Sequence, residues 1–395
     1  MKPIPYGRHF ISEQDISAVV ETLRSDYLTQ GPKVSEFERK FAEYVGAKYA
    51  VAVANGTAAL HLSVLALGLK PGQKVITTPI TFAASANCVR YAGADIVFVD
   101  IDPETILIDL QKVRKILERN PRGTFAGIIS VDFAGYPVDL SAVRELANEY
   151  GLWVLEDACH APGGYFVDRD GITHRCGDGS LADLAIFSFH PVKHIATGEG
   201  GMITTNREEL YEKLLRLRTH GITKVPEQMM ENHGGWYYEM QDLGYNYRMP
   251  DILASLGISQ LERADENLRR RREIAKRYDE AFQDAPIKII KPKENFYHAY
   301  HLYVIQLEKR KELYEYLREK QIYAQVHYIP LHLMPYYKNL GWRKGDFPAA
   351  EAYYDQCLSL PMYPTLSDEE QNFVIETVID FLSEKMQREA ITRIS

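Results

Sequence analysis

Hydrophobic positions in the first half of the chain follow two alternating patterns. Short apolar runs rich in β-branched residues predict buried strands, and they lie at Tyr49–Val53, Lys74–Thr78, Ile96–Val99, Gly127–Val131, Leu152–Leu155, Ala185–Phe189 and Met202–Thr205. Runs with helical spacing separate several of them, as at Leu60–Leu67 and Leu140–Tyr150. Because such alternation builds parallel sheets covered by helices, the pattern predicts an α/β fold with a mostly parallel seven-stranded sheet.

Two helices are predicted outside this alternation. Ser35 and Glu38 have the spacing of a capping box and precede a helical apolar pattern. The segment Pro250–Phe282 has the pattern of one long helix that is rich in charge in its second half. We expect it to lead from a large α/β domain, residues 1–250, into a smaller α+β domain, residues 251–395.

Composition excludes several function classes. The formal net charge is −8 and the pI is about 5.9, so no basic face for nucleic acid is expected, and the run at 269–273 is interpreted as a solvated helix face. No apolar stretch approaches the length of a membrane helix, and the N-terminus has no apolar signal core, which predicts a cytoplasmic protein. The cysteines are scattered, which argues against disulfides or a zinc site and for a reducing compartment; they are Cys88, Cys159, Cys176 and Cys357. No metal site is predicted.

Lys193 is the most informative candidate for chemistry. It follows the predicted strand at Ala185–Phe189 and precedes the glycine-rich run Gly198–Gly201. A lysine among apolar residues at a strand end is a candidate Schiff-base lysine, because desolvation disfavours the ammonium and frees the amine for attack on an aldehyde. Taken alone, an exposed loop lysine would explain the same position.

Three upstream segments strengthen this interpretation. Asp157 ends a predicted central strand, where a carboxylate points into the crevice that binds ligands in open α/β sheets; a helix cap is the alternative. Gly56 and Thr57 begin a predicted helix, and a glycine, a hydroxyl and free amides suit a phosphate, although turn and cap roles explain them too. Phe82 offers a flat ring to a planar cofactor, or simply a core aromatic.

The order of these pieces resembles the fold-type-I, pyridoxal-phosphate-dependent aminotransferases, which are aspartate aminotransferase-like, and specifically the DegT/StrS-type sugar aminotransferases. The resemblance includes Leu28–Pro32, Gly198–Gly201 and Gly244–Met249 and covers nearly the whole chain. It implies that pyridoxal 5′-phosphate forms a Schiff base with Lys193, whose amine later moves the substrate proton. It also implies that Asp157 pairs with the pyridine nitrogen.

The same resemblance assigns the remaining cofactor contacts. Gly56, Thr57 and Ser188 are expected at the phosphate. His160 stands where many family members have a glutamine that bonds the ring oxygen, so its titration would add pH dependence; a packed, hydrogen-bonded histidine is the alternative. Asn246 resembles the family asparagine that reaches the phosphate of the partner subunit's cofactor. The protein is therefore expected to be a homodimer with shared active sites.

Motifs around Leu28–Gly31, Ser130–Gly135 and Ala324–Tyr328 are similar to those of aminotransferases of the pseudaminic-acid pathway. This implies that glutamate is the amino donor and that the acceptor is C4 of UDP-2-acetamido-2,6-dideoxy-β-L-arabino-hexos-4-ulose. The product would be UDP-4-amino-4,6-dideoxy-N-acetyl-β-L-altrosamine. The expected substrate-binding residues are Thr29, Gln30, His327 and Tyr328, although an alternating strand would also explain the last two.

Other functions stay open at this point. Another 4-keto or 3-keto nucleotide sugar of spore-coat, O-antigen or antibiotic biosynthesis is one alternative, and a non-catalytic pyridoxal-phosphate-binding regulator is another. Related dehydratases have a histidine in place of Lys193, which argues against that class. The run Asp168–Gly171 is interpreted as a hairpin turn and not as a calcium loop.

Overall fold

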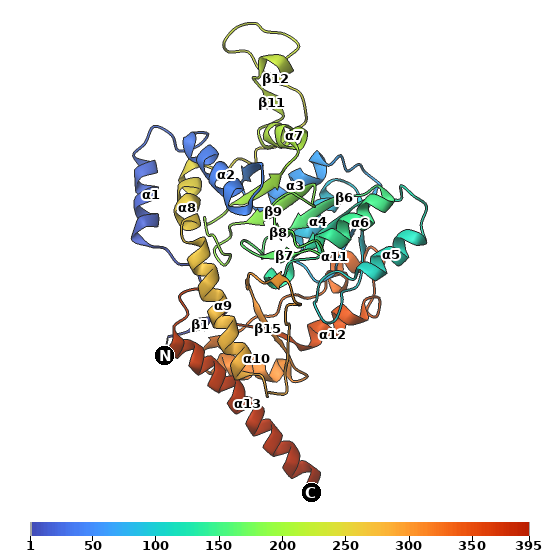
Figure 1. The fold of residues 1–395 in the computed structure, drawn as a ribbon, viewed down its shortest axis with the longest axis vertical. Coiled ribbons are helices and arrows are strands. Elements are labelled where there is room, and N and C mark those ends of the chain that lie inside the picture. Colours follow the sequence, from blue (N-terminus) through green and yellow to red (C-terminus); the bar gives the residue numbers. More distant parts are fainter. Residues whose placement is uncertain (1, 395) are drawn as a thin grey trace.

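A seven-stranded sheet forms the centre of the molecule (Figure 1). The computed structural model describes the backbone of residues 2–394 and the side chains of residues 2–383. The strand order is β2-β10-β9-β6-β5-β3-β4; β10 is antiparallel to both neighbours and the other paired strands are parallel. The strands are β2 (Tyr49–Val53), β3 (Lys74–Thr77), β4 (Asp95–Phe98), β5 (Phe125–Val131), β6 (Trp153–Asp157), β9 (Leu184–Ser188) and β10 (Gly201–Thr205). The predicted mostly parallel seven-stranded sheet is confirmed.

Helices cover both faces of this sheet. They are α2 (Pro32–Val45), α3 (Gly56–Ala66), α4 (Ala84–Tyr91), α5 (Leu110–Glu118), α6 (Leu140–Tyr150) and α7 (Glu208–Arg218). Alternate residues of β2 enter different cores: Ala50 and Ala52 pack in the cluster that holds α2, and Val51 and Val53 pack in the cluster that holds α3. Successive side chains of a strand point to opposite faces of the sheet, so these two clusters show that both faces are buried. This burial explains the continuous apolar runs in the sequence.

The start of α2 differs from the sequence prediction. The helix begins at Pro32, so Ser35 lies inside it and donates to the Pro32 carbonyl at 3.0 Å. The capping-box prediction at Ser35 and Glu38 is wrong. Asp251 caps the helix instead, because its carboxylate accepts from the amides of Gly31 and Lys33 at 2.8 Å each.

The predicted single helix at Pro250–Phe282 is also wrong, because the segment forms two helices. These are α8 (Asp251–Leu261) and α9 (Ala264–Ala281), separated at Arg263, whose backbone leaves helical geometry. The Arg263 guanidinium donates to Asp15 at 2.6 Å, on α1 (Glu13–Leu23), which lies beside α8 in Figure 1. A tertiary ion pair thus holds the break, which contains neither proline nor glycine.

A second core lies beside the sheet domain and belongs mostly to the C-terminal part of the chain. Its elements are β13 (Lys288–Ile289), β15 (Tyr303–Gln306), α10 (Arg310–Glu319), β16 (Ile322–Tyr323), β17 (Cys357–Leu360) and α13 (Asp368–Ile394), with β14 (Phe296–Tyr297), α11 (Pro335–Lys338) and α12 (Pro348–Gln356) nearer the sheet. The N-terminal strand β1 (Ile4–Pro5) joins this core by pairing with β16. The domain division at residue 250 stays a prediction.

Two hairpins leave the main body. β7 (Tyr165–Val167) and β8 (Thr173–Arg175) are antiparallel, and residues 168–171 turn between them, so the predicted hairpin turn is confirmed. β11 (Ile222–Thr223) and β12 (Glu239–Met240) form an arm that projects beyond α7 (Figure 1). None of the helices within residues 2–394 combines the length and apolar character needed to cross a membrane.

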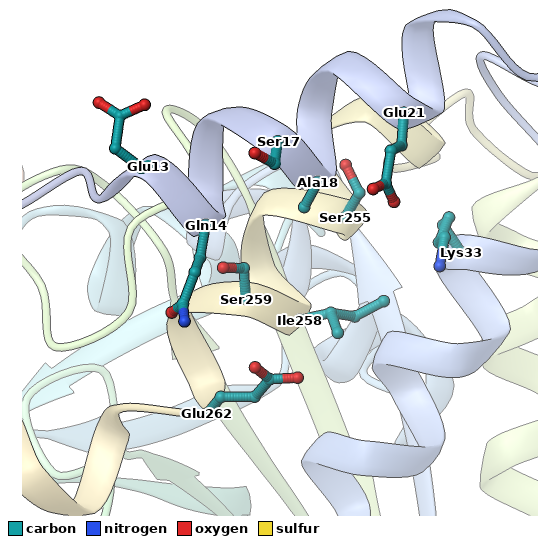
Figure 2. Close-up of a pocket in the computed structure, with 10 residues that line it drawn as sticks. All are labelled: Glu13, Gln14, Ser17, Ala18, Glu21, Lys33, Ser255, Ile258, Ser259 and Glu262. Atoms are coloured by element: carbon teal, nitrogen blue, oxygen red, sulfur yellow. The ribbon is translucent and has the colours of Figure 1, made fainter.

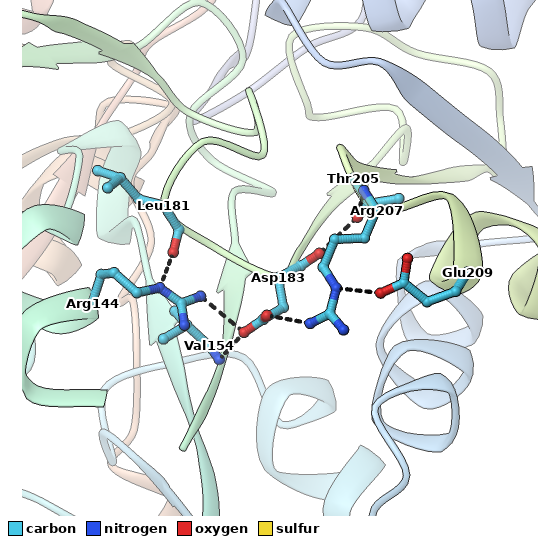
Figure 3. Close-up of polar contacts among 7 residues, drawn as sticks. All are labelled: Arg144, Val154, Leu181, Asp183, Thr205, Arg207 and Glu209. Atoms are coloured by element: carbon cyan, nitrogen blue, oxygen red, sulfur yellow. Dashed lines mark hydrogen bonds and ion pairs between the residues drawn. The ribbon is translucent and has the colours of Figure 1, made fainter. Parts of the chain in front are cut away.

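An ion cluster fixes the start of β9, the strand that leads toward Lys193 (Figure 3). Asp183 accepts from the guanidinium groups of Arg144 and Arg207 at 2.8 Å each and from the Val154 amide at 2.8 Å. Burial alone would raise the pKa of Asp183, but the hydrogen bond from Arg144 and the neighbouring charges lower it. A firmly ionised carboxylate therefore ties β9 to β6 and sets the register of both strand ends.

Candidate active site

A pocket of about 500 Å³ lies where the parallel strands end. Nine of the residues predicted from the sequence line it: Gly56, Thr57, Phe82, Asp157, His160, Ser188, Lys193, His327 and Tyr328. They come from the start of α3, the loop before α4, the ends of β6 and β9, and the segment after β16. The carboxyl ends of parallel strands meet at one edge, which is why residues so distant in sequence converge here.

The start of α3 forms one end of the pocket. Asn55 caps the helix by accepting from the Ala58 amide at 2.8 Å, which leaves the amides of the first helical residues, Gly56 and Thr57, without an intrahelical partner. A Cβ atom on Gly56 would lie 3.0 Å from the Cβ of Ser188, so glycine allows the helix to approach β9. Two hydroxyls, free amides and the positive end of a helix dipole make this an anion site.

Asp157 lies at another wall of the pocket and is held by hydrogen bonds. It accepts from the Ser85 hydroxyl at 2.6 Å and from the Cys159 amide at 3.2 Å. Ser85 is itself hydrogen-bonded to Thr81 at 2.8 Å, one turn earlier. Only 6% of Asp157 is exposed, so its carboxylate has a fixed direction.

Phe82 offers a stacking ring to the pocket, and Lys193 offers a reactive amine. Phe82 is 61% exposed, which is unusual for a phenylalanine that lines a pocket and leaves its ring free to cover a planar ligand. Burial lowers the pKa of Lys193, although the charges of Cys159 and Asp157 oppose that shift. Its amine is therefore more readily deprotonated than that of an exposed lysine.

His160 is both packed and directed at the pocket. Its Nδ1 accepts from the Ala134 amide at 3.2 Å, which places the ring proton on Nε2, and Nε2 lies 3.2 Å from the Tyr328 hydroxyl. Burial lowers the pKa of His160 well below the usual value. The pH dependence expected from its titration is therefore wrong for the neutral range, because the ring stays uncharged there.

His327 and Tyr328 come from the segment after β16 and are not part of a strand. His327 is bonded to the Ser359 hydroxyl at 2.9 Å, and burial lowers its pKa to about 3. Tyr328 lies 6.3 Å from the Phe82 ring, between centroids. The two residues join the C-terminal part of the chain to the pocket, as the sequence resemblance implied.

Sequence reasoning missed several residues of the pocket. Ser85 lies at the start of α4, four residues after Thr81, and this spacing of two hydroxyls before a predicted helix could have revealed it. Tyr6 comes from the segment after β1, and His301 precedes β15; neither has a sequence signal, because only the fold brings them to Lys193.

Thr29, Gln30 and Asn246 do not line this pocket. Thr29 is exposed, and Gln30 lines a shallow cavity of about 250 Å³ together with Thr219 and Arg248. Asn246 is exposed too and pairs with Thr219 in an isolated β-bridge. We call Gln30, Thr219, Asn246 and Arg248 the Thr219 surface. The predicted contacts of these residues with cofactor or substrate stay predictions.

Another cavity, of about 410 Å³, lies between α1 and α8 (Figure 2). The carboxylates of Glu13, Glu21 and Glu262 and the amine of Lys33 surround it, and no aromatic residue lines it. It contains none of the predicted site residues. Lacking a stacking face and a buried nucleophile, it does not offer the chemistry of the Lys193 pocket.

Comparisons with known proteins identify the family. The DegT/DnrJ/EryC1/StrS aminotransferase family matches residues 9–379. The chain is 42% identical to the spore coat polysaccharide biosynthesis protein SpsC of Bacillus subtilis, over 96% of this chain and 97% of that protein. It is 38% identical to a UDP-4-amino-4,6-dideoxy-N-acetyl-beta-L-altrosamine transaminase of Campylobacter jejuni, over 98% of this chain and 99% of that enzyme.

Solved structures of sugar aminotransferases are similar to this chain over nearly its whole length. Helicobacter pylori PseC, an aminotransferase of pseudaminic acid biosynthesis, superposes with a TM-score of 0.87 at 30% identity, over 97% of this chain and 100% of that one. A sugar aminotransferase of Streptococcus pneumoniae in its PLP form gives a TM-score of 0.87 at 32% identity, over 97% and 99% of the two chains.

The residues of the Lys193 pocket fit pyridoxal phosphate. The start of α3 suits a phosphate, the open face of Phe82 suits a flat ring, the Asp157 carboxylate suits a protonated ring nitrogen, and the Lys193 amine suits an aldehyde. The tight approach of Gly56 to Ser188 leaves the phosphate end free of a side chain. The chain therefore belongs to the DegT/DnrJ/EryC1/StrS family and is a pyridoxal-phosphate-dependent nucleotide-sugar aminotransferase.

Proposed function

We propose that this aminotransferase moves the amino group of glutamate to C4 of a UDP-linked 4-keto-6-deoxy-N-acetylhexosamine. The acceptor is UDP-2-acetamido-2,6-dideoxy-β-L-arabino-hexos-4-ulose, and the product is UDP-4-amino-4,6-dideoxy-N-acetyl-β-L-altrosamine for a surface glycan. The observation that carries the proposal is full-length similarity to an altrosamine transaminase together with the fit to PseC. A cytoplasmic location is also proposed, since the scattered cysteines suit a reducing compartment.

The pocket residues divide the work of this reaction. Pyridoxal phosphate, when bound, supplies an aldehyde and an electron-withdrawing ring that stabilises negative charge on a substrate carbon. Asp157 holds the ring nitrogen protonated, and Ser85 fixes the direction of that carboxylate. The Lys193 amine takes the proton from the α-carbon of glutamate and would pass it to the aldehyde carbon of the cofactor. In the second half of the reaction it would move a proton the other way, onto C4 of the sugar, and its lowered pKa favours the uptake.

The nucleotide sugar is proposed to enter between the sheet domain and the segment after β16. His327 is held neutral by burial and by its bond to Ser359, so it can act as a hydrogen-bonding group without carrying charge. Tyr328 lies between His160 and Phe82 and can contact the sugar where it meets the cofactor. Both contacts suit a polar, uncharged hexose ring.

The active unit is proposed to be a homodimer in which Thr29, Gln30 and Asn246 act at the partner's pocket. Their exposure on one chain supports this, because residues that bind a ligand within the same chain would line its pocket. The arm carries exposed apolar side chains suited to an interface, including Met230 at 89% and Trp236 at 76% exposure.

A half-reaction tests the substrate. The enzyme is converted to its pyridoxamine form with glutamate, freed of glutamate, and mixed separately with the L-arabino 4-keto sugar and its D-xylo epimer. Fast return of the visible band of the aldehyde form with the L-arabino sugar alone is expected. A return with the D-xylo sugar alone would overturn the substrate, and a band that glutamate never bleaches would overturn the donor.

A different nucleotide keto sugar is the second candidate, and one observation favours it. Identity to the spore coat protein is 42%, compared with 38% for the altrosamine transaminase. A panel of dTDP-, GDP- and UDP-linked keto sugars in the same half-reaction separates the candidates. A non-catalytic regulator would not be converted to the pyridoxamine form by glutamate and would aminate none of these sugars.

Replacing Lys193 tests the chemistry itself. Lys193→Ala should abolish amination, because no other amine lines the pocket among the described residues, while noncovalent cofactor binding remains. Dialysis and absorbance measure the cofactor, and product formation measures the activity. Lys70→Ala, which changes an exposed lysine outside the pocket, is the matched control and should behave as the native enzyme. Amination by the Lys193 variant would contradict the proposal.

A further inference from the structure

His301 is the side chain in closest polar contact with the amine of Lys193. Its Nε2 lies 3.4 Å from the Lys193 Nζ. Among residues 2–383, it is the side chain that forms a hydrogen bond with that amine. His301 is 4% exposed and lines the pocket. It comes from the segment before β15, more than a hundred residues after Lys193.

The backbone on both sides of His301 is fixed to the sheet domain. The Ala299 amide donates to the Gly135 carbonyl at 2.7 Å, and the Leu302 amide donates to the Ala134 carbonyl at 3.1 Å. His194, next to Lys193 in the chain, bonds the Ala299 carbonyl at 2.8 Å. The backbone that carries the imidazole is therefore tied both to residues 134–135 and to the loop that carries Lys193.

Arg271 holds the same segment from α9. Its guanidinium donates to the carbonyls of Tyr300 at 3.1 Å, His301 at 3.4 Å and Met362 at 3.1 Å. It is 1% exposed, so the interpretation of the run at 269–273 as a solvated helix face is wrong for this residue. No carboxylate pairs with it among the described residues. A buried cation that binds only carbonyls leaves its positive charge uncompensated, which disfavours a second cation nearby.

Burial decides the direction of the hydrogen bond between His301 and Lys193, and the charge of Arg271 acts in the same direction. Burial, followed by the charge of Lys193, lowers the pKa of His301 well below the usual value, so the imidazole is neutral. Burial also lowers the pKa of Lys193, but an alkylamine remains the stronger base. The proton therefore stays on the lysine nitrogen, which donates, and the His301 Nε2 accepts.

We propose that His301 is a positioning residue for Lys193, whose amine it holds in the pocket by accepting a hydrogen bond from Nζ. The inference rests on the proposed role of Lys193. A fixed amine can meet an aldehyde and a substrate carbon in turn without searching several rotamers, each of which would lower the fraction of productive encounters. The neutral imidazole does this without taking the proton that the lysine must carry.

Other charged and titratable groups line this pocket or act on its lysine and histidines, and they stay unchanged in the test. They are Asp157, Cys159 and His160 after β6, His190 and His194 on the lysine loop, Glu199 before β10, Arg271 on α9, His298 before β15, and Tyr6, His327 and Tyr328 from the N-terminal and C-terminal segments.

The test measures the titration of Lys193 in cofactor-free protein. Brief acetylation at a series of pH values between about 6 and 11, followed by peptide mass spectrometry, gives the midpoint at which Lys193 becomes reactive. His301→Phe removes the acceptor and keeps a ring of similar size, and His301→Gln keeps an acceptor. His174→Gln is the matched control, since His174 is buried but bonds Asp168 and Ser180 away from the pocket.

His301→Phe should lower the Lys193 midpoint by about one pH unit, because an ammonium loses a charge-assisted hydrogen bond. The Gln variant and the His174 control should keep the native midpoint. In the holoenzyme, kcat should fall about tenfold in the Phe variant with KM for the nucleotide sugar unchanged. If the Phe variant does not fold, His301→Ala replaces it as the variant without an acceptor. The Lys193 midpoint should then be lowered in His301→Ala and native in His301→Gln.

An unchanged or raised midpoint in both acceptor-free variants overturns the proposal, even if activity falls, since packing alone would explain that loss. A lowered midpoint in a chain that fails to aminate any keto sugar supports the His301–Lys193 contact and refutes the proposed function. The two failures are therefore distinguishable.

Discussion

The Lys193 pocket and the Thr219 surface hold two groups of residues that the sequence assigned to one site. The pocket residues lie at the ends of β6 and β9, the start of α3 and the adjoining loops, and Asp157, His160 and His327 among them are buried. Gln30 and Asn246 instead lie exposed beside Thr219. A single chain completes the chemistry around Lys193 but leaves part of the expected binding site facing outward. This difference is the reason for the proposal that two copies of the chain share each site.

The largest expected effect tests this division directly. Lys193→Ala and Asn246→Ala homodimers should each be nearly inactive, because each lacks one half of every site. Unfolded together and refolded as a mixture, they should recover about a quarter of native activity, since half of the dimers then hold one intact site. Product formation after mixing measures this. A mixture as inactive as its parents would place both residues in the same half of the site.

The next effect concerns the pocket alone. Asp157→Asn keeps the shape of the side chain, whose oxygen can accept from the Cys159 amide and whose NH2 group can donate to Ser85, but it removes the charge, so the ring nitrogen loses its ionic partner. We expect kcat to fall on the order of a hundredfold or more and cofactor affinity to weaken. Steady-state rates and cofactor titration measure both. Ser85→Ala, which loosens the same carboxylate without removing charge, should show a smaller loss.

An ion pair between Arg218 and Glu38 lies next to the Thr219 surface, and a substitution there changes no residue of the Lys193 pocket. Arg218 donates to Glu38 and to the Ala52 carbonyl, and both charged side chains are mostly buried. Arg218→Met leaves the Glu38 carboxylate with the Ala52 amide alone, so we expect a loss of about 3 kcal/mol in the free energy of unfolding. Urea denaturation measures it. The double variant with Glu38→Gln should recover part of the loss.

A different kind of pair, formed by two buried carboxyl groups, lies next to Asp157 of the pocket. The carboxyl groups of Asp132 and Glu156 meet in the core with no cationic side chain bonded to either in the described part of the chain. Burial raises the pKa of Asp132 to about 7 and that of Glu156 well above its usual value. The folded protein therefore binds more protons here than the unfolded chain.

The sign of the pH effect follows from this. Stability from the pair is complete below a pH of about 4 and is lost as the pH rises through about 7. Glu156→Gln replaces the shared proton with an amide and should flatten this loss. Denaturation at pH 5 and pH 8 measures the slope for both proteins. Equal slopes would show that the pair does not hold the proton.

Particular residues show where sequence reasoning succeeds. The strands were predictable because both faces of the sheet are buried, so each strand is a continuous apolar run, as at Tyr49–Val53. Lys193, Asp157 and Phe82 were predictable because each follows such a run at a fixed place in a family motif. The start of α2 was partly predictable, since Pro32 at the first helical position is a helix-start signal.

Other features depend on contacts between distant segments. The cap of α2 comes from Asp251, the break before α9 is held by Asp15, and His301 meets Lys193 across the boundary between two cores. No local pattern marks any of these, because the interacting residues are far apart in the chain. The outward position of Asn246 likewise depends on how its segment pairs with Thr219.

The sequence by itself determined the α/β class, the seven strands, the family and the reactive groups, because burial patterns and motif chemistry are local properties of the chain. Only the tertiary structure decided which of those groups share a pocket, why His160 stays neutral, and which side chain holds the lysine amine. Desolvation and hydrogen-bond direction depend on everything packed around a residue, and sequence spacing alone does not contain that information.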